Sequence, residues 1–289
     1  MASETDYIQS YKEHLELTNY SERTIESYLS HVRSFFKFCK THKQSDLPFQ
    51  EYVRKYLYHL RKHDFSWSTI NSNYSSLKLL YERILKGVWI AENLPRPKMP
   101  KKLPRVLSQA EVARLIEAPS CFKHRVIIIF LYATGLRISE ALNVKVSDID
   151  SERLEIYVSQ GKGDKDRLVS LPEVLLIILR QYYVVYKPPL YLFQGLSRSG
   201  RYSKSSVRKI LIRARAKAKI TKPLSAHTLR HCYATHQLEN GTDLVYIKEQ
   251  LGHTNLMTTA KYIHLCGPRH RYINHPIDKL SLHIEQSTT

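Results

Sequence analysis

The sequence predicts a mainly α protein of two domains, a four-helix N-terminal domain and a mixed α+β C-terminal domain with a small β-hairpin. Apolar residues recur every three to four positions along much of the 289-residue chain, as in amphipathic helices. Apolar and polar residues alternate on both sides of a Gly-x-Gly turn, as in a hairpin. A proline-rich run separates the two parts. We therefore expect a helical domain at 1–92, a linker at 93–106, a mixed domain at 107–265 and a tail at 266–289.

The first 92 residues are expected to form four helices. Their apolar residues recur at helical spacing, and a serine stands where the second helix would begin. The indicative positions are Tyr7, Tyr11 and Leu15; Ser21 as N-cap, with Ile25, Tyr28, Leu29, Val32, Phe35, Phe36 and Cys39; Phe49 to Leu60, with Tyr56; and Ile70 to Leu85, with Tyr74, Leu77 and Ile84. Four helices are about enough for an independent core, in which we expect the aromatic residues to lie.

The linker is both proline-rich and basic. Four prolines at 93–105 exclude a helix and favour an extended connector, and five Lys and Arg residues accompany them. A later helix, at 203–219, is also strongly basic, which suits a helix that lies on DNA. The residues expected to contact DNA are Lys98, Lys101, Lys102 and Arg105 in the linker and Arg208, Lys209, Arg213 and Arg215 on that helix.

The charge of the chain is large and uneven. The formal net charge is +19; residues 1–97 hold 14 Lys and Arg against 11 Asp and Glu, and residues 98–289 hold 31 against 15. An excess of this size points to a polyanionic partner, most often nucleic acid.

Other features of the composition predict a cytoplasmic protein that does not contact a membrane. The four cysteines lie far apart without a C-x-x-C pair, which is typical of free thiols in a reducing compartment. The N-terminus has no basic-then-apolar signal. The longest apolar run, from Val126 to Ala133, is too short to span a bilayer.

The second domain is expected to open with a capping box at 108–111, followed by a buried helix at 122–133. Gly135 is expected to end that helix in the left-handed conformation, which would place Arg137 at the start of the next helix, one turn before Glu140. Arg137 could be present only to form a stabilising ion pair with Glu140. Such a pair does not exclude a chemical role, since a carboxylate can orient an arginine.

The remaining elements of the second domain place further polar residues. The alternation predicts hairpin strands at 154–158 and 167–171, with Lys162 at the tip of the hairpin. Lys165 lies nearby and is the alternative candidate for any role assigned to Lys162. Helices are predicted at 172–186, 203–219, from Ser225 onward, from Asp243 to Gly252, and at 258–264. His227 would lie in the first turn of the helix capped by Ser225, near the end that attracts anions.

Six side chains form a candidate site for phosphate chemistry. Guanidinium groups match phosphate oxygens in pairs, and a phenol can attack phosphorus once cations lower its pKa from about 10. Five of the residues are Arg137, His227, Arg230, His253 and Tyr262. The sixth is Lys162; a lysine on a turn is usually solvated, and only a resemblance to a known family singles it out. His231 and His236 are assigned structural roles. His227 and His231 have a spacing found in zinc helices, but no third ligand follows, so no metal site is predicted.

In this order and spacing, the six residues resemble the signature of tyrosine recombinases, the phage integrase family, with the layout of the Xer recombinases. Arg230 follows His227 by three positions, Tyr262 follows His253 by nine, and no functional position of the pattern is missing. The resemblance covers nearly the whole chain and is strongest from Leu107 to Leu265.

The resemblance implies a SAM-like core-binding domain that closes over DNA, followed by the catalytic domain. It implies site-specific recombination or integration through a 3′-phosphotyrosyl intermediate and a Holliday junction. The implied partner is double-stranded DNA with paired recombination sites. The implied assembly is a homo-tetramer, or a hetero-tetramer with a related recombinase. The tail would pack either on its own domain or, as the resemblance implies, on a neighbouring subunit. The setting would be the nucleoid of a bacterium or of a mobile element's host.

Neither ATP nor a redox cofactor is expected, because the phosphotyrosyl ester retains the bond energy, and the cations make a divalent metal redundant. Two alternatives remain open. A DNA-binding regulator that never cuts would explain the basic helices but not the six residues. A topoisomerase of the IB type would use the same chemistry to cleave and reseal one strand without exchange.

Overall fold

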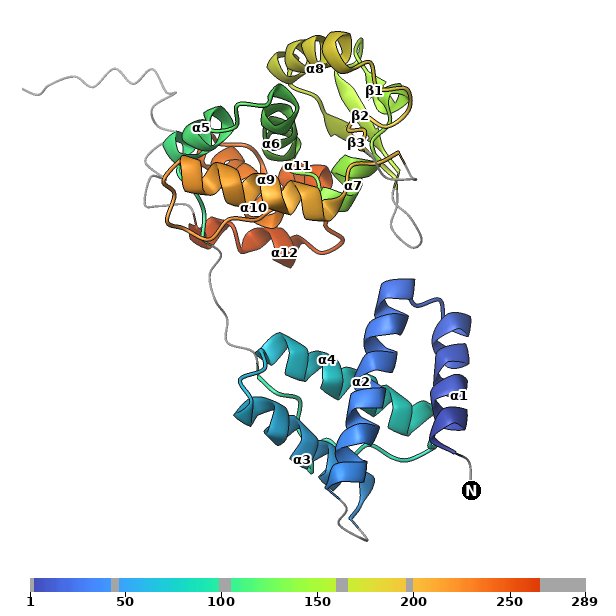
Figure 1. The fold of residues 1–289 in the computed structure, drawn as a ribbon. Helices are drawn as coiled ribbons and strands as arrows, with labels where there is room; N and C mark the ends of the chain where they lie inside the picture. The colour runs from blue at the N-terminus through green and yellow to red at the C-terminus, as the bar shows by residue number, and fades with distance from the viewer. Residues whose placement is uncertain (1–2, 43–46, 99–104, 160–165, 196–199, 266–289) are drawn as a thin grey trace, which may run out of the picture. The chain divides into compact units, whose positions relative to one another are not determined.

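The computed structural model describes residues 3–42, 47–98, 105–159, 166–195 and 200–265. The chain divides into two compact units, Met1–Lys102 and Leu103–Thr289. Both units are mainly helical, and the second contains a small antiparallel sheet, as the sequence predicts (Figure 1). Among the described residues, no helix has the length and apolar character needed to cross a bilayer.

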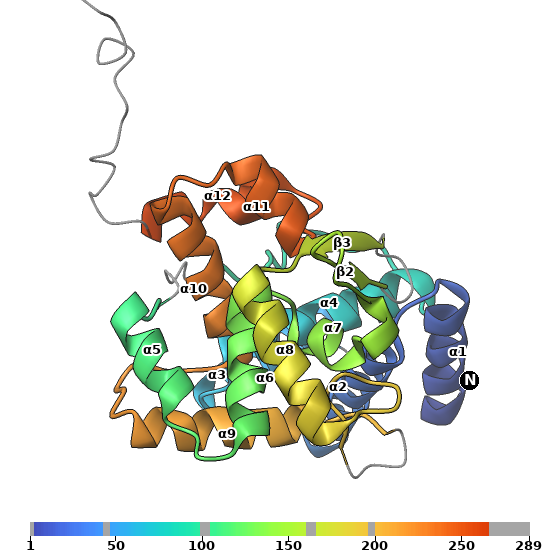
Figure 2. The ribbon, with the colours of Figure 1, turned by 90° about the horizontal axis from the view of Figure 1, so that it is seen from above.

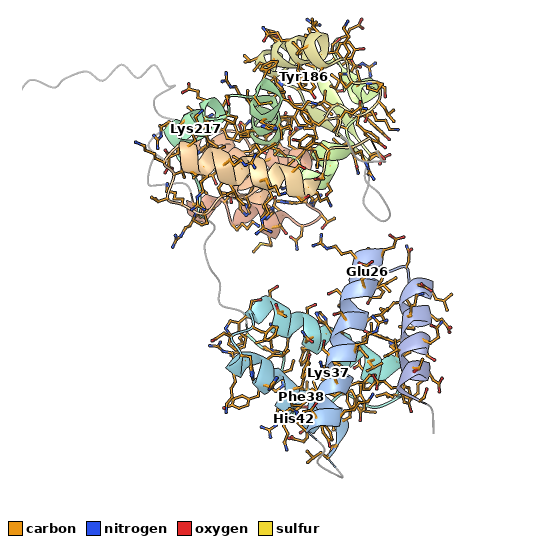
Figure 3. The ribbon with its side chains drawn as sticks, in the orientation of Figure 1. Glu26, Lys37, Phe38, His42, Tyr186 and Lys217 are labelled. Atoms are coloured by element: carbon orange, nitrogen blue, oxygen red, sulfur yellow. The ribbon has the colours of Figure 1, made fainter. Side chains whose placement is uncertain are left out.

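The first unit is a four-helix domain. Its helices are α1 (Glu4–Leu17), α2 (Glu22–Thr41), α3 (Phe49–Lys62) and α4 (Trp67–Arg83). The predicted N-cap is confirmed, because the Ser21 hydroxyl accepts from the Thr24 N–H. Phe38 and His42 lie one turn apart near the end of α2, with their rings stacked 4.2 Å apart (Figure 3).

Aromatic residues fill the core of the first unit, as expected. Tyr11 is fully buried and donates a hydrogen bond to the Ser76 carbonyl. The segment after α4 returns over the helices, where Trp89 donates to the Tyr74 hydroxyl, which in turn donates to the Leu94 carbonyl. These buried polar groups are therefore paired within the unit.

The second unit contains eight further helices among its described residues. They are α5 (Gln109–Glu117), α6 (Phe122–Thr134), α7 (Ile138–Asn143), α8 (Glu173–Tyr186), α9 (Lys204–Lys217), α10 (Ala226–Glu239), α11 (Leu244–Leu251) and α12 (Leu256–Ala260). Two short 3-10 helices are η1 (Val146–Asp148) and η2 (Ile263–Leu265). The predicted capping box that starts α5 is confirmed.

Helix α6 is at the centre of the second unit. It is apolar nearly all round, which is typical of a fully buried helix. It contacts α5, α7, α8, α9 and α10, and Figure 2 shows it between α5, α8 and α10. A residue placed just after α6, such as Arg137, is therefore held by the core of the unit.

The small sheet has three strands in the order β1 (Ile149–Asp150), β2 (Glu155–Val158) and β3 (Arg167–Ser170), all antiparallel. The predicted hairpin corresponds to β2 and β3, with Val158 opposite Arg167 and Glu155 opposite Ser170. Its turn, with Lys162 and Lys165, lies outside the described residues. Strand β1 was not predicted, because two residues are too few to show an alternation.

Candidate active site

A left-handed glycine carries the chain from α6 to Arg137. Gly135 has φ 61°, as predicted, and a Cβ atom there would lie 2.4 Å from the Tyr233 ring. Arg137 is then the N-cap residue of α7, and its backbone N–H donates to the Glu140 carboxylate at 2.9 Å. Its guanidinium also pairs with Glu140 at 2.6 Å, so the predicted ion pair is confirmed.

Arg230 is the most deeply buried charged group of the site. Its side chain is 1% exposed, and its two Nη atoms donate to the carbonyls of Gly135 and Leu251. Its Nε has no hydrogen-bond partner among the described residues. Burial, and then the charge of Arg137, lower the pKa of Arg230 to about 10, so the group remains cationic at neutral pH.

His253 follows the end of α11, where Gly252 is again left-handed with φ 63°. As predicted, the histidine therefore lies in the loop after the helix. Its Nδ1 is 2.8 Å from the Thr259 hydroxyl, and its ring is nearly parallel to that of Tyr262 at 6.5 Å between centroids. Burial, and then the positive charge of Arg230, lower the pKa of His253 to about 3, so His253 is neutral at physiological pH.

Tyr262 lies between α12 and η2, two short helices in place of the single helix predicted at 258–264. It is fully buried, and its hydroxyl is 2.9 Å from Nδ1 of His231. The expectation that cations lower its pKa is wrong for this conformation. Burial raises the pKa of Tyr262, and Arg230 offsets only part of the rise.

His231 is a residue whose place at the site the sequence interpretation missed. It was assigned a structural role, yet its ring contacts both Tyr262 and the ring of His227, the latter at 4.3 Å between centroids. Burial, and then the charge of His227, lower the pKa of His231 to about 4. The i,i+4 spacing from His227, noted only for metal binding, was the signal for this placement.

The structure thus brings four of the six predicted residues, Arg137, Arg230, His253 and Tyr262, to the C-terminal end of α11. His227 is exposed in the first turn of α10, with its ring against His231. Lys162 lies outside the described residues. Among the described residues, no three His, Cys, Asp or Glu side chains are grouped so as to hold a metal ion.

Of the residues expected to contact DNA, five are exposed: Lys98, Arg105, Arg208, Lys209 and Arg213. Lys101 and Lys102 lie outside the described residues. Arg215 is partly buried and its Nε donates to the Ile220 carbonyl, which stabilises the end of α9.

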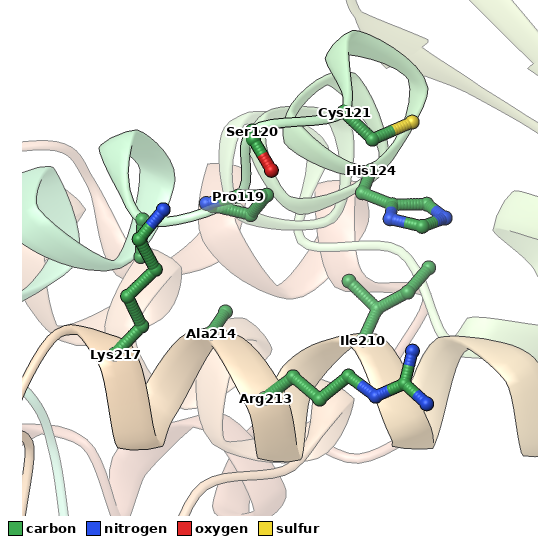
Figure 4. Close-up of a pocket in the computed structure, with 9 residues that line it drawn as sticks. Pro119, Ser120, Cys121, His124, Ile210, Arg213, Ala214 and Lys217 are labelled. Carbon is green, nitrogen blue, oxygen red and sulfur yellow. The ribbon is translucent and has the colours of Figure 1, made fainter.

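A cavity of about 310 Å³ lies between α9 and the start of α6, apart from the candidate active site. Figure 4 shows Arg213 and Lys217 on its α9 side, facing Ser120, Cys121 and His124. None of the described candidate catalytic residues lines it.

Comparison with known proteins identifies the chain. Residues 105–267 match the phage integrase family, and residues 7–91 match the phage integrase N-terminal SAM-like domain. The fold and these matches define the class, which is that of the tyrosine-type site-specific recombinases. More particularly, the chain belongs to the phage integrase family.

Relatives at 30% identity or more cover most of the chain. A putative integrase/recombinase of Sinorhizobium fredii is 37% identical over 89% of this chain and 83% of its own length. The tyrosine recombinase XerA of Pyrococcus horikoshii is 32% identical over 89% of this chain and 88% of its own. A crystal structure of XerA recombinase matches with 30% identity and a TM-score of 0.54, covering 93% of this chain and 96% of that one.

More distant structures share the fold. A lambda integrase dimer bound to a core site has a TM-score of 0.74 at 18% identity, covering 87% of this chain and 95% of that one. XerH recombinase in a post-cleavage complex with its substrate has a TM-score of 0.72 at 22% identity, covering 94% of this chain and 84% of that one.

Proposed function

We propose that this recombinase cleaves and rejoins paired recombination sites in double-stranded DNA through a 3′-phosphotyrosyl intermediate and a Holliday junction. The observation that carries the proposal is the convergence of Arg137, Arg230 and His253 beside Tyr262 at one helix end. Two guanidinium groups, a neutral imidazole and a phenol are the groups needed to hold a phosphodiester and attack it.

In the proposed reaction, the Tyr262 oxygen forms a bond to phosphorus while the bond from phosphorus to the 5′-oxygen breaks. Arg137 and Arg230 bind the non-bridging oxygens, where each donor is worth ~3 kcal/mol once charge develops. The unpartnered Nε of Arg230 is a donor that a phosphate oxygen can satisfy. His253 is neutral and donates to the same oxygens.

Two proton transfers complete the step. The phenol proton leaves through a histidine, and His227 is the proposed base, with His231 between it and the hydroxyl. The leaving 5′-oxygen is more basic than a phenolate and needs an acid, which we assign to Lys162. General acid catalysis of this kind contributes roughly a hundred- to ten-thousand-fold.

Tyr262 must become accessible before it can attack, because its side chain is fully buried. It lies between a five-residue helix and a 3-10 helix, and both are short enough to shift without disturbing the core around α6. We propose that DNA binding draws this segment towards the scissile phosphate.

Contacts with DNA are proposed for the linker and for α9, through the exposed Lys98, Arg105, Arg208, Lys209 and Arg213, with Lys101, Lys102 and Arg215. The relative bound to a core site is a lambda integrase dimer, which supports duplex DNA as the partner. The large positive charge of residues 98–289 supports the same partner.

We further propose a homo-tetramer, or a hetero-tetramer with a related recombinase, that acts on nucleoid DNA in the cytoplasm and away from membranes. The tail at 266–289 would pack on a neighbouring subunit through Ile277, Leu280, Leu282 and Ile284. Ending the chain at Arg271 should then spare binding to a half-site and reduce strand exchange. Loss of half-site binding together with a sharply lower Tm would instead place the tail on its own domain.

The decisive experiment uses a duplex site that is selected from random DNA and nicked beside the cleavage position. Cleavage then releases a short fragment that dissociates, so the covalent complex cannot be rejoined and accumulates. The wild-type chain should form a complex with DNA that survives SDS, equally in excess EDTA, since the proposed chemistry uses no metal. Binding without any such complex would favour a regulator that does not cut. A complex without recombinants from paired sites would favour a topoisomerase, and a requirement for magnesium would refute the mechanism.

A further inference from the structure

Three consecutive carbonyl groups at the end of α11 each accept a hydrogen bond from a different arginine. Arg167 donates from Nε to the Gln250 carbonyl at 3.1 Å, Arg230 to Leu251 at 2.6 Å and Arg137 to Gly252 at 3.3 Å. The last carbonyls of a helix have no partner within the helix, and cations are favoured at that end. The end of α11 therefore fixes the three guanidinium groups relative to one another.

The same three arginines surround the buried carboxylate of Glu140. Arg167 spans both oxygens, with Nη2 at 2.9 Å and Nη1 at 3.4 Å. Arg137 lies at 2.6 Å and Arg230 at 3.9 Å. Burial alone would raise the pKa of Glu140, but the hydrogen bond and charge of Arg167, with the hydrogen bonds from the backbone and side chain of Arg137, lower it below its ordinary value, so Glu140 is ionised.

The arginine side chains differ in solvent exposure, which determines how readily each can contact a phosphate. The side chain of Arg137 is 38% exposed, whereas that of Arg167 is 10% exposed. In this conformation a phosphate can therefore reach Arg137, while Arg167 is enclosed between β3 and α11. Arg230 is only 1% exposed, so its proposed contact with the phosphate requires the shift of the Tyr262 segment proposed above. Because Arg137 pairs with Glu140 at 2.6 Å, binding a phosphate competes with that ion pair, whereas the enclosed Arg167 can hold the carboxylate throughout.

A second set of contacts fixes Arg167 where it is. The guanidinium lies against Gly252, where a Cβ atom would approach it to 2.9 Å. Three residues further along β3, the Ser170 N–H donates to the side chain of Gln250 at 2.9 Å. Strand β3 is thus joined to the end of α11 at two points, immediately before the loop that carries His253.

From these contacts we infer that Arg167 is a positioning residue for strand cleavage. It holds the Glu140 carboxylate and the end of α11, so that Arg137 can leave its own pair with Glu140 for the scissile phosphate while His253 stays in place. The inference rests on the proposed function of the site. A lysine cannot replace Arg167 fully, because its single ammonium cannot span the carboxylate and also reach the Gln250 carbonyl as a planar fork does.

The test compares Arg167→Gln, Arg167→Lys, Glu140→Gln and the double variant Arg167→Gln/Glu140→Gln. Lys222→Gln is the matched control, because Lys222 also pairs with a carboxylate, that of Glu111 at 2.7 Å, and donates to a backbone carbonyl, that of Val106. Affinity for the selected site and the single-turnover rate of adduct formation on the nicked duplex are measured separately. Rates are taken at saturating DNA and at a temperature where circular dichroism shows every variant to be folded.

Arg167→Gln should bind DNA nearly as well as wild type but cleave about 10- to 100-fold more slowly, by analogy with the loss typical of residues that orient metal ligands. Arg167→Lys should cleave at a rate between those of wild type and Arg167→Gln. The double variant should cleave faster than Arg167→Gln alone, because the neutral amide that replaces the Glu140 carboxylate no longer captures Arg137. The control should cleave at the wild-type rate.

Two results would overturn the inference. One is an Arg167→Gln rate equal to that of wild type. The other is a double variant no faster than Arg167→Gln, which would leave Arg167 with a purely structural role. If Arg167→Gln does not fold, the rates of Arg167→Lys with and without Glu140→Gln decide in the same way. Absence of any adduct from the wild-type chain would instead refute the proposed function itself.

Discussion

Two buried tyrosines, one in each unit, show how the partner of a phenol determines what it can do. Tyr11 and Tyr262 are both fully buried and both hydrogen-bonded. Tyr11 donates to the Ser76 carbonyl, which cannot take up the proton, whereas the partner of Tyr262 is an imidazole that can. Burial raises the pKa of both phenols, but only Tyr262 has a cation, Arg230, that opposes the rise.

A buried tyrosine with a satisfied hydrogen bond can therefore have a chemical role as well as a role in packing. Around Tyr11 the partners are neutral and the core is apolar. Around Tyr262 lie two histidines, and the amine of Lys261 is 5.2 Å from the centre of its ring. Such a concentration of cations and bases beside one phenol has no benefit for packing, which supports a chemical role.

The strongest way to break the comparison is to remove each hydroxyl in turn. Tyr262→Phe should abolish the covalent DNA complex and leave site binding nearly unchanged. Tyr11→Phe should cleave at the wild-type rate but lower the free energy of unfolding by about 1 kcal/mol, the usual worth of one hydrogen bond. Adduct gels and denaturant titration measure the two effects. Loss of cleavage in Tyr11→Phe, at a temperature where it is folded, would remove the distinction.

Replacing one arginine in each unit sharpens the comparison. Arg230→Lys loses the planar fork at the site and should reduce cleavage about 10²- to 10³-fold. Arg96→Lys is its counterpart in the first unit, where Arg96 donates to the side chains of Asn71 and Ser75, and it should leave the cleavage rate unchanged. Single-turnover rates at saturating DNA measure both variants, and equal rates for the two would contradict the assignment of Arg230.

A third prediction uses the pH dependence of stability. The pKa of His231 is about 4 in the folded chain and about 6.5 when unfolded, so the unfolded chain binds more protons between these values. Stability should therefore fall as pH decreases from 6.5 towards 4, by about 2 to 4 kcal/mol for this one group. His231→Gln should flatten the curve, as followed by denaturant unfolding at a series of pH values. An unchanged curve would show that His231 is not buried in its neutral form.

The smallest expected effect concerns DNA affinity. Arg208→Ala, which removes an exposed charge from α9, should weaken binding similarly for all sequences and reduce the magnitude of the salt slope by about 0.9. Arg215→Ala should change the salt slope less, because the Arg215 side chain is partly buried and donates a hydrogen bond to the Ile220 carbonyl. Binding titrations over a range of salt concentrations measure both slopes. Equal slopes for the two variants would refute this view of α9.

Local features of this fold could be predicted from the sequence because their contacts span only a few residues. The N-cap at Ser21, the capping box at Ser108 and the left-handed Gly135 are examples. The ion pair between Arg137 and Glu140 was predictable for the same reason.

Contacts between distant residues could not be predicted in this way. The pairing of Glu140 with Arg167, 27 residues away, and the contact of His231 with Tyr262 both depend on how α7, α10 and β3 pack. The predicted direction of the Tyr262 pKa shift was wrong, because burial raises the pKa by more than the charge of Arg230 lowers it. The sequence does not show how deeply a residue is buried. The family pattern predicts which residues act at the site, but it does not show how they contact one another.

The most direct test of the central claim is to identify the residue that becomes joined to DNA. The trapped complex would be digested with nuclease and protease, and the peptide that carries the remaining nucleotide sequenced by mass spectrometry. We predict that the nucleotide is on Tyr262, the buried tyrosine held by His231. A nucleotide on any other of the 20 tyrosines, or on a serine, would contradict the account.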